Sequence, residues 1–108
     1  MDVYTDKTLN GCNWFITNGS KSAVINIPVV FNLGIRSCNI TNILVAMRIN
    51  TGGHLGGSEK INLTQYISNT VLSLAQGLIV VTLTNNNGWG MTNNTPISGY
   101  VVMNFSLF

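Results

Sequence analysis

Residues 78–108 constrain the fold of this chain more than any other stretch. They begin with the β-branched run Leu78-Ile-Val-Val-Thr-Leu-Thr84 and end with a second such run from Ile97 to Phe108. The residues between the two runs are mostly Asn, Gly, Thr and Pro, which are typical of loops and turns. The stretch therefore predicts two antiparallel strands that are joined by a long loop.

The last run places apolar residues on both faces of a strand. Alternate residues from Val101 to Leu107 are apolar and fall on one face. The other face carries Tyr100, Val102 and Phe108 among polar residues. A two-layer fold buries only one face of each sheet, so the second face needs another cover. We therefore expect Tyr100, Val102 and Phe108 to lie in a contact between subunits of an oligomer.

Charge is scarce and unevenly placed in the 108-residue chain, whose length indicates one domain. Only 7% of the residues are charged, against about 25% in an ordinary domain, and all of them precede Ile61. So neutral a surface favours self-association, although a polar uncharged surface alone would also be ordinary for a secreted β-domain. The net charge of +2 is too small and too dispersed for a nucleic-acid footprint. No stretch is apolar enough for a membrane span, and the N-terminus has no apolar signal region.

Most of the remaining chain has the composition of short strands. We expect strands within residues 14–17, 22–33 and 37–50, with an edge, bulge or break at Pro28 and a possible turn within 39–42. The predicted fold class is all-β: an antiparallel β-sandwich of jelly-roll or immunoglobulin-like type, with at most one short helix.

The helix is expected near residues 63–76, where apolar residues recur at helical spacing, with a strand as the alternative. Residues 11–108 would form the single sandwich domain. The polar residues 1–10 are expected to be an N-terminal arm or a strand added to a neighbouring chain.

Residue types that carry catalysis or bind metal ions are sparse. The chain has one histidine, His54, in a glycine-rich loop, and three carboxylates. A general base needs a nucleophile and an orienting group at fixed positions, which such a loop does not supply. The loop also lacks the Lys-Ser/Thr pair of a phosphate-binding loop. We therefore expect no enzyme activity, no cofactor and no metal site, and we expect Cys12 and Cys38 to be free thiols.

The loop of residues 85–95 has two interpretations. An aromatic ring among amides is what a sugar site needs, so Trp89 could stack on a pyranose ring while Asn86 and Asn87 bond its hydroxyls. The favoured interpretation is that Trp89 folds back and covers the core. The two readings differ in whether Trp89 is exposed.

The second half of the chain resembles the C-terminal β-domains of fibres and other appendages of tailed bacteriophages. The resemblance rests on Ile61-Asn-Leu-Thr, Gly77-Leu-Ile-Val-Val-Thr-Leu-Thr, the Asn-Gly-Trp loop and the run from Ile97 to Phe108. The small size and Asn-rich composition are also similar to head-fibre or capsid-associated proteins of crAss-like gut phages.

The resemblance implies a non-enzymatic structural component of a virion that is assembled in the host cytoplasm. It also implies a homo-oligomer, with a trimer favoured, that is attached to capsid or fibre subunits, and no contact with nucleic acid or membrane. The alternative is a carbohydrate-binding module that recognises glycans of the host surface, with Trp89 at its centre.

Overall fold

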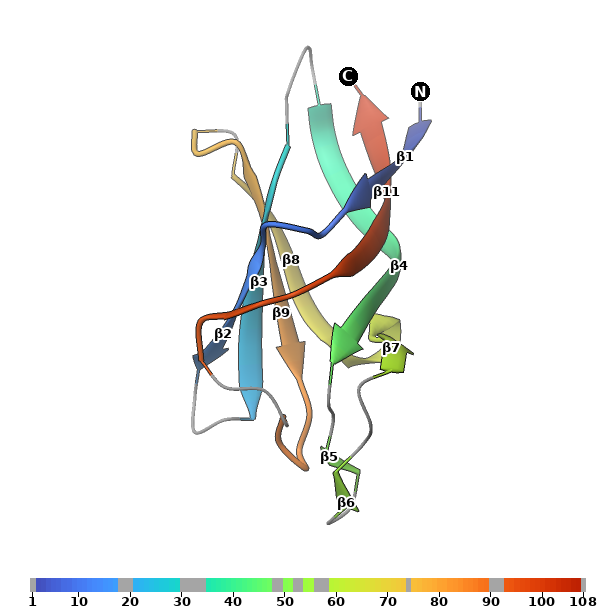
Figure 1. Ribbon diagram of the computed structural model, residues 1–108. Helices are drawn as coiled ribbons and strands as arrows, with labels where there is room; N and C mark the ends of the chain where they lie inside the picture. The colour runs from blue at the N-terminus through green and yellow to red at the C-terminus, as the bar shows by residue number, and fades with distance from the viewer. Residues whose placement is uncertain are drawn as a thin grey trace.

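The computed structural model of the chain describes residues 2–17, 21–29, 35–47, 50–51, 54–55, 59–73, 75–89 and 93–107. These residues form two antiparallel sheets that pack face to face (Figure 1). The expected all-β class and antiparallel β-sandwich are thereby confirmed. Figure 1 also shows that both chain ends lie at the same end of the sandwich.

One sheet has four strands and the other has five. The four-stranded sheet has the order β1 (Asp2–Thr8), β11 (Gly99–Leu107), β4 (Ile35–Met47) and β7 (Glu59–Asn62). The five-stranded sheet has the order β10 (Thr95–Pro96), β2 (Asn13–Thr17), β3 (Ser22–Pro28), β9 (Leu78–Thr84) and β8 (Ile67–Ser73). Two short strands, β5 (Asn50–Thr51) and β6 (His54–Leu55), pair with each other.

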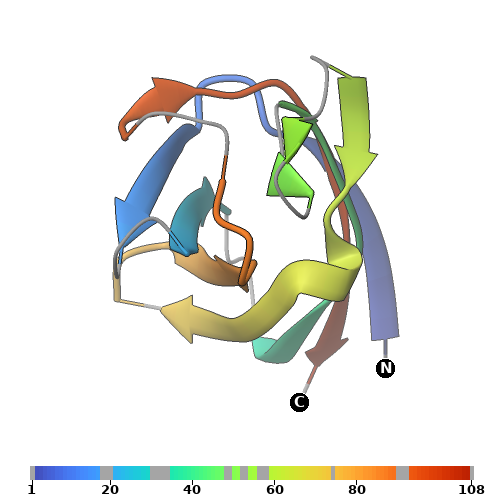
Figure 2. The same ribbon diagram turned by 90° about the horizontal axis from the view of Figure 1, so that it is seen from below.

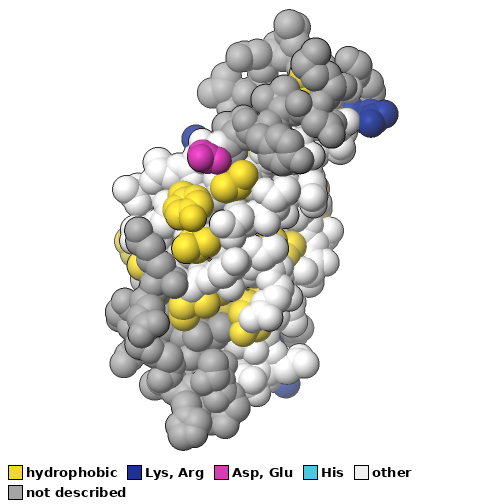
Figure 3. Space-filling view, turned by 90° about the vertical axis from the view of Figure 1, so that its right-hand side faces the viewer, with side chains coloured by type: hydrophobic (Ala, Val, Ile, Leu, Met, Phe, Trp, Pro, Cys, Tyr) yellow, Lys and Arg dark blue, Asp and Glu magenta, His cyan; other side chains and the backbone are white. Residues whose placement is uncertain are grey.

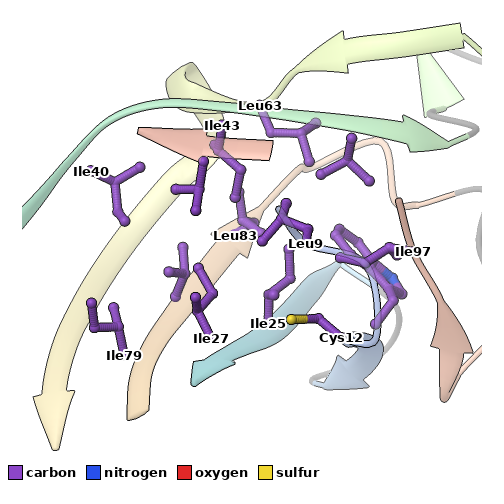
Figure 4. Packing of buried hydrophobic residues seen from close by; sticks show 14 of the residues in the cluster. Leu9, Cys12, Ile25, Ile27, Ile40, Ile43, Leu63, Ile79, Leu83 and Ile97 are labelled. Atoms are coloured by element: carbon purple, nitrogen blue, oxygen red, sulfur yellow. The ribbon is translucent and has the colours of Figure 1, made fainter. Parts of the chain in front are cut away.

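The core lies between the sheets and is built from alternate residues of the central strands. In β3 and β9 every second side chain is buried, and β11 follows the same pattern from Val101 to Phe105. Figure 4 shows such residues, Ile25, Ile27, Ile79 and Leu83 among them, converging with Ile43 and Leu63. Each fully buried aliphatic side chain contributes about 1.5–3 kcal/mol through the hydrophobic effect.

A β-bulge lets β4 remain one strand where a turn was possible. Val102 pairs with Asn42 and Met103 pairs with Ile40, so Thr41 is an extra residue in β4. The Thr41 Oγ1 hydroxyl donates a hydrogen bond of 3.2 Å to the Val102 carbonyl at this point. The bulge shifts the alternation by one residue, so that both Ile40 and Ile43 point into the core.

The expected helix within residues 63–76 is wrong, and the alternative, a strand, is present. A single 3-10 turn, η1 (Thr64–Tyr66), leads into β8, which pairs with β9. Tertiary pairing decides the conformation here, because β9 supplies hydrogen-bond partners while Leu72 and Ile67 pack against the core. Viewed from below, β8 follows η1 and forms one edge of the five-stranded sheet (Figure 2).

The two runs of residues 78–108 form the expected strands, but these strands are not neighbours. Strand β9 lies in the five-stranded sheet, whereas β11 lies in the four-stranded sheet between β1 and β4. The loop between them crosses from one sheet to the other, and Trp89 and Ile97 on it are buried in the core. Because these two side chains become buried, a loop that crosses between the sheets is favoured, and a hairpin between β9 and β11 is not.

The N-terminal segment, for which an arm was expected, is a strand of the same chain. Strand β1 pairs with β11 from Asp2 opposite Ser106 to Thr8 opposite Tyr100. Leu9, which follows it, is fully buried, and its N–H donates to the Gly99 carbonyl over 3.0 Å.

Candidate functional site

Trp89, the candidate sugar-stacking residue, lies in the core. Its side chain is 5% exposed. Its ring meets Trp14 edge to face at 5.0 Å between centroids, and meets Tyr66 in the same way at 5.4 Å. The Nε1–H donates a hydrogen bond of 3.0 Å to the Lys21 carbonyl. A ring that is covered in this way presents no face on which a sugar could stack.

The amides around Trp89 hold the loop in shape. The Asn85 side chain donates from Nδ2 to the Gly88 carbonyl over 2.9 Å and accepts at Oδ1 from the Asn87 N–H. The Asn85 backbone N–H donates to the Lys21 carbonyl, which thus binds both ends of this turn. Asn86 and Asn87 are exposed at its tip.

Further along the loop, Asn93 and Asn94 tie it to β2. Asn93 Oδ1 accepts from the Ile16 N–H, and Asn94 Oδ1 accepts from the Asn13 side chain, both over 2.9 Å. The Asn-rich composition that indicated sugar binding therefore serves the loop's own hydrogen bonds at these positions.

A shallow depression of about 530 Å³ lies beside η1 and is lined by Asn62, Thr64 and Gln65. Two of these three residues, Asn62 and Thr64, are hydrogen-bonded to each other. Thr64 Oγ1 donates to Asn62 Oδ1 over 2.6 Å and accepts from the Ile43 N–H. The depression therefore offers few unpaired groups to a ligand.

No three of His, Cys, Asp and Glu come together among the residues that the structure describes. The side chains of His54 and Glu59 lie outside the described part, as do Gly52 and Gly53. Cys12 and Cys38 are not bonded to each other. Burial raises the pKa of Cys38 from its usual value of 9.0 to about 11.

Cys12 resembles Cys38 in this respect. Burial also raises its pKa, while the positive charge of Lys7 acts in the opposite direction. Both thiols are therefore protonated at neutral pH, and a protonated thiol is a poor nucleophile and metal ligand.

The candidate subunit contact lies on the outer face of the four-stranded sheet. Tyr100 is 38% exposed and Val102 is half-buried, while Phe108 lies outside the described residues. Val102 stands opposite Asp6 of β1 in the sheet register. Figure 3 shows this face, on which several hydrophobic side chains lie among polar ones with an acidic side chain beside them.

The five-stranded sheet differs from its partner because none of its strands contains a charged residue. The strands of the four-stranded sheet carry six, namely Asp2, Asp6, Lys7, Arg36, Glu59 and Lys60. The separation of charge between the two sheets is not visible along the sequence, because strands from both halves of the chain alternate between the sheets.

An apolar stripe crosses the outer face of the five-stranded sheet. The stripe consists of Phe15, Val24, Val80 and Val71. Phe15 pairs with Val24 in the register, and Val80 pairs with Val71, which is 46% exposed. Between these two pairs Thr82 stands opposite Val24 and Asn26 stands opposite Val80, so Val24 and Val80 are diagonal neighbours. Cross-strand partners share one face, and the alternate residues of β3 and β9 are buried, so these four side chains point outward. Sequence reasoning missed this stripe because its members come from four strands.

No family model matches the chain, and comparisons with curated proteins and with solved structures find no similar protein. Among the described residues, no helix is long and apolar enough to cross a membrane.

Proposed function

We propose that this chain is a non-enzymatic structural subunit of a bacteriophage virion, oligomeric and attached to other virion proteins. The observation that supports the proposal best is the five-stranded sheet, which is free of charge and carries the apolar stripe on its outer face. Depletion of charge together with exposed aromatic and aliphatic groups is typical of the centre of protein–protein interfaces. The resemblance to phage appendages supplies the kind of assembly.

The carbohydrate-binding alternative has less support. Its central residue, Trp89, is covered by Trp14 and Tyr66, and its Nε1–H is already bonded. The exposed amides of Asn86 and Asn87 alone would give hydrogen bonds without a stacking surface. We therefore describe Trp89 as a core residue and assign no glycan contact to it.

Threefold association through Tyr100, Val102 and Phe108 remains part of the proposal. Among the described residues, Tyr100 and Val71 are the exposed large hydrophobic side chains. Asp6 stands beside Val102, so a contact on this face needs a partner group that pairs with or avoids this carboxylate.

Quantitative mass spectrometry of purified virus particles tests the proposal. Particles produced from the genome that encodes this chain should contain it in a fixed ratio to the major capsid protein, and the ratio should survive a density gradient and a high-salt wash. Abundant expression in infected cells with none in the particles would contradict a virion role. A matched host protein of similar size serves as the contamination control.

A further inference from the structure

The free edge of β8 is the least protected edge in the sandwich. Strand β8 ends the five-stranded sheet and is hydrogen-bonded to β9 on one side only within the part of the chain that the structure describes. It spans seven residues, Ile67–Ser73, and contains neither a charged residue nor a proline. An edge of this kind presents a row of backbone donors and acceptors that another strand can pair with.

The other three edge strands carry features that oppose such pairing, and the part of β4 that extends past β7, residues 35–43, carries Arg36 and the bulge at Thr41. Strand β1 contains two aspartates and a lysine, and β7 contains Glu59 and Lys60. Strand β10 has two residues, of which one is Pro96, and proline cannot donate to a ladder. Charges, prolines and short edge strands are the usual protection against association of edges. Strand β8 lacks all three.

The part of β8 that is open to pairing is its second half. A bulge interrupts the ladder between Ile67 and Asn69, and the Ser68 hydroxyl donates back to the Thr82 carbonyl over 3.2 Å. From Asn69 to Ser73 the ladder with β9 is regular, each residue opposite one partner. This regular segment includes Val71, where the apolar stripe reaches the edge.

We propose that β8 pairs with β8 of a second copy of the chain, antiparallel and about a twofold axis. The pairing joins two five-stranded sheets into one continuous sheet of about ten strands and brings the two apolar stripes together at Val71, as expected for an antiparallel two-fold pair. A second copy suits this edge because two identical charge-free strands meet without like-charge repulsion. The joined sheet then ends in the protected β10 on both sides, so the assembly closes as a dimer.

The contact is independent of the threefold contact proposed for the other sheet, and of the virion role. Subunits that make only the β8 contact form dimers. If the subunits also form trimers, the β8 contacts join two trimers into a hexamer, whose mass is twice that of the trimer. In both cases, breaking the β8 contact halves the native mass.

A charge at the edge tests the pairing. Val71→Lys places an ammonium group where the two copies meet, and Asn69→Lys does the same at a second exposed position of this strand. Ser37→Lys is the control, because Ser37 is an exposed residue of β4 in the other sheet and the change in charge is the same. Native mass is measured by light scattering at 10–100 µM, on the order of the concentrations at which such contacts form, with circular dichroism to check folding.

We expect both edge variants to have half the native mass of the wild type and the control to keep the full mass. Hydrogen exchange should show slower exchange of the amides of residues 69–73 in the wild type than in Val71→Lys. A wild type that is monomeric or purely trimeric, edge variants with unchanged mass, or an equal loss in the control would each overturn the proposal. None of these results would alter the particle measurement that tests the virion role.

Discussion

Trp89 connects three separate parts of the chain. Its ring packs on Trp14 of β2 and on Tyr66 of η1, and its Nε1–H is bonded to Lys21 before β3. A side chain with these contacts contributes to stability through burial, through two edge-to-face aromatic pairs and through one hydrogen bond.

Trp89→Ala should lower the free energy of unfolding by about 3–5 kcal/mol, the usual range for loss of a buried large aromatic side chain. Urea unfolding followed by circular dichroism measures the change. Asn86→Ala, at the exposed tip of the same turn, should change it by less than about 0.5 kcal/mol. If Trp89→Ala were as stable as the wild type, Trp89 would not be a core residue.

At the scale of elements, β11 holds the four-stranded sheet together, because it lies between β1 and β4. Its first residue, Gly99, has φ +147° and approaches β4 closely. A Cβ atom at this position would lie 1.9 Å from the Leu44 carbonyl oxygen, which is backbone and cannot move aside alone. The start of β11 therefore depends on glycine.

Gly99→Ala should destabilise the fold by about 3 kcal/mol or more, because strain at a constrained backbone position adds to the clash. Gly11→Ala is the matched control. Gly11 has φ +90°, but no atom lies within 4 Å of an added Cβ, so only the backbone cost of about 1–2 kcal/mol applies. Thermal melts of both variants measure the difference in stability. Equal losses of stability in the two variants would show that the close approach to Leu44 does not exclude a side chain at position 99.

At the scale of the whole molecule, stability depends little on charge, because charged residues are few and lie mainly in one sheet. The two thiols, Cys12 buried and Cys38 partly buried, are the exception at alkaline pH. Burial holds the pKa of Cys38 at about 11 in the folded chain, above its usual value of 9.0. The stabilising effect of the neutral thiol is thus complete below pH 9 and is lost as the pH rises through 11, because the unfolded chain releases its proton first.

The free energy of unfolding should therefore fall between about pH 9 and pH 11, and Cys38→Ala should reduce this fall. Urea unfolding at pH 8 and pH 10.5 measures both slopes, and the fall that remains in the variant includes the contribution of Cys12, whose pKa burial also raises. Parallel pH profiles for wild type and variant would contradict the assignment to Cys38.

The sequence by itself determined the all-β class, because β-branched runs that alternate between apolar and polar residues bury one face only as strands in packed sheets. It also predicted that Trp89 would cover the core, which the 5% exposure of its side chain confirms. Local pattern misjudged residues 63–76, where helical spacing of apolar residues competed with pairing to β9, and tertiary pairing decided the outcome.

Only the tertiary structure decided which strands share a sheet. The chain passes repeatedly between the two layers, so β9 and β11 are separated, β1 joins β11 across almost the whole length of the sequence, and all charged residues of the strands of these two sheets lie in the four-stranded sheet. Phe15, Val24, Val80 and Val71 become one surface only through this pairing, because cross-strand register is set by long-range contacts that no single stretch of sequence contains.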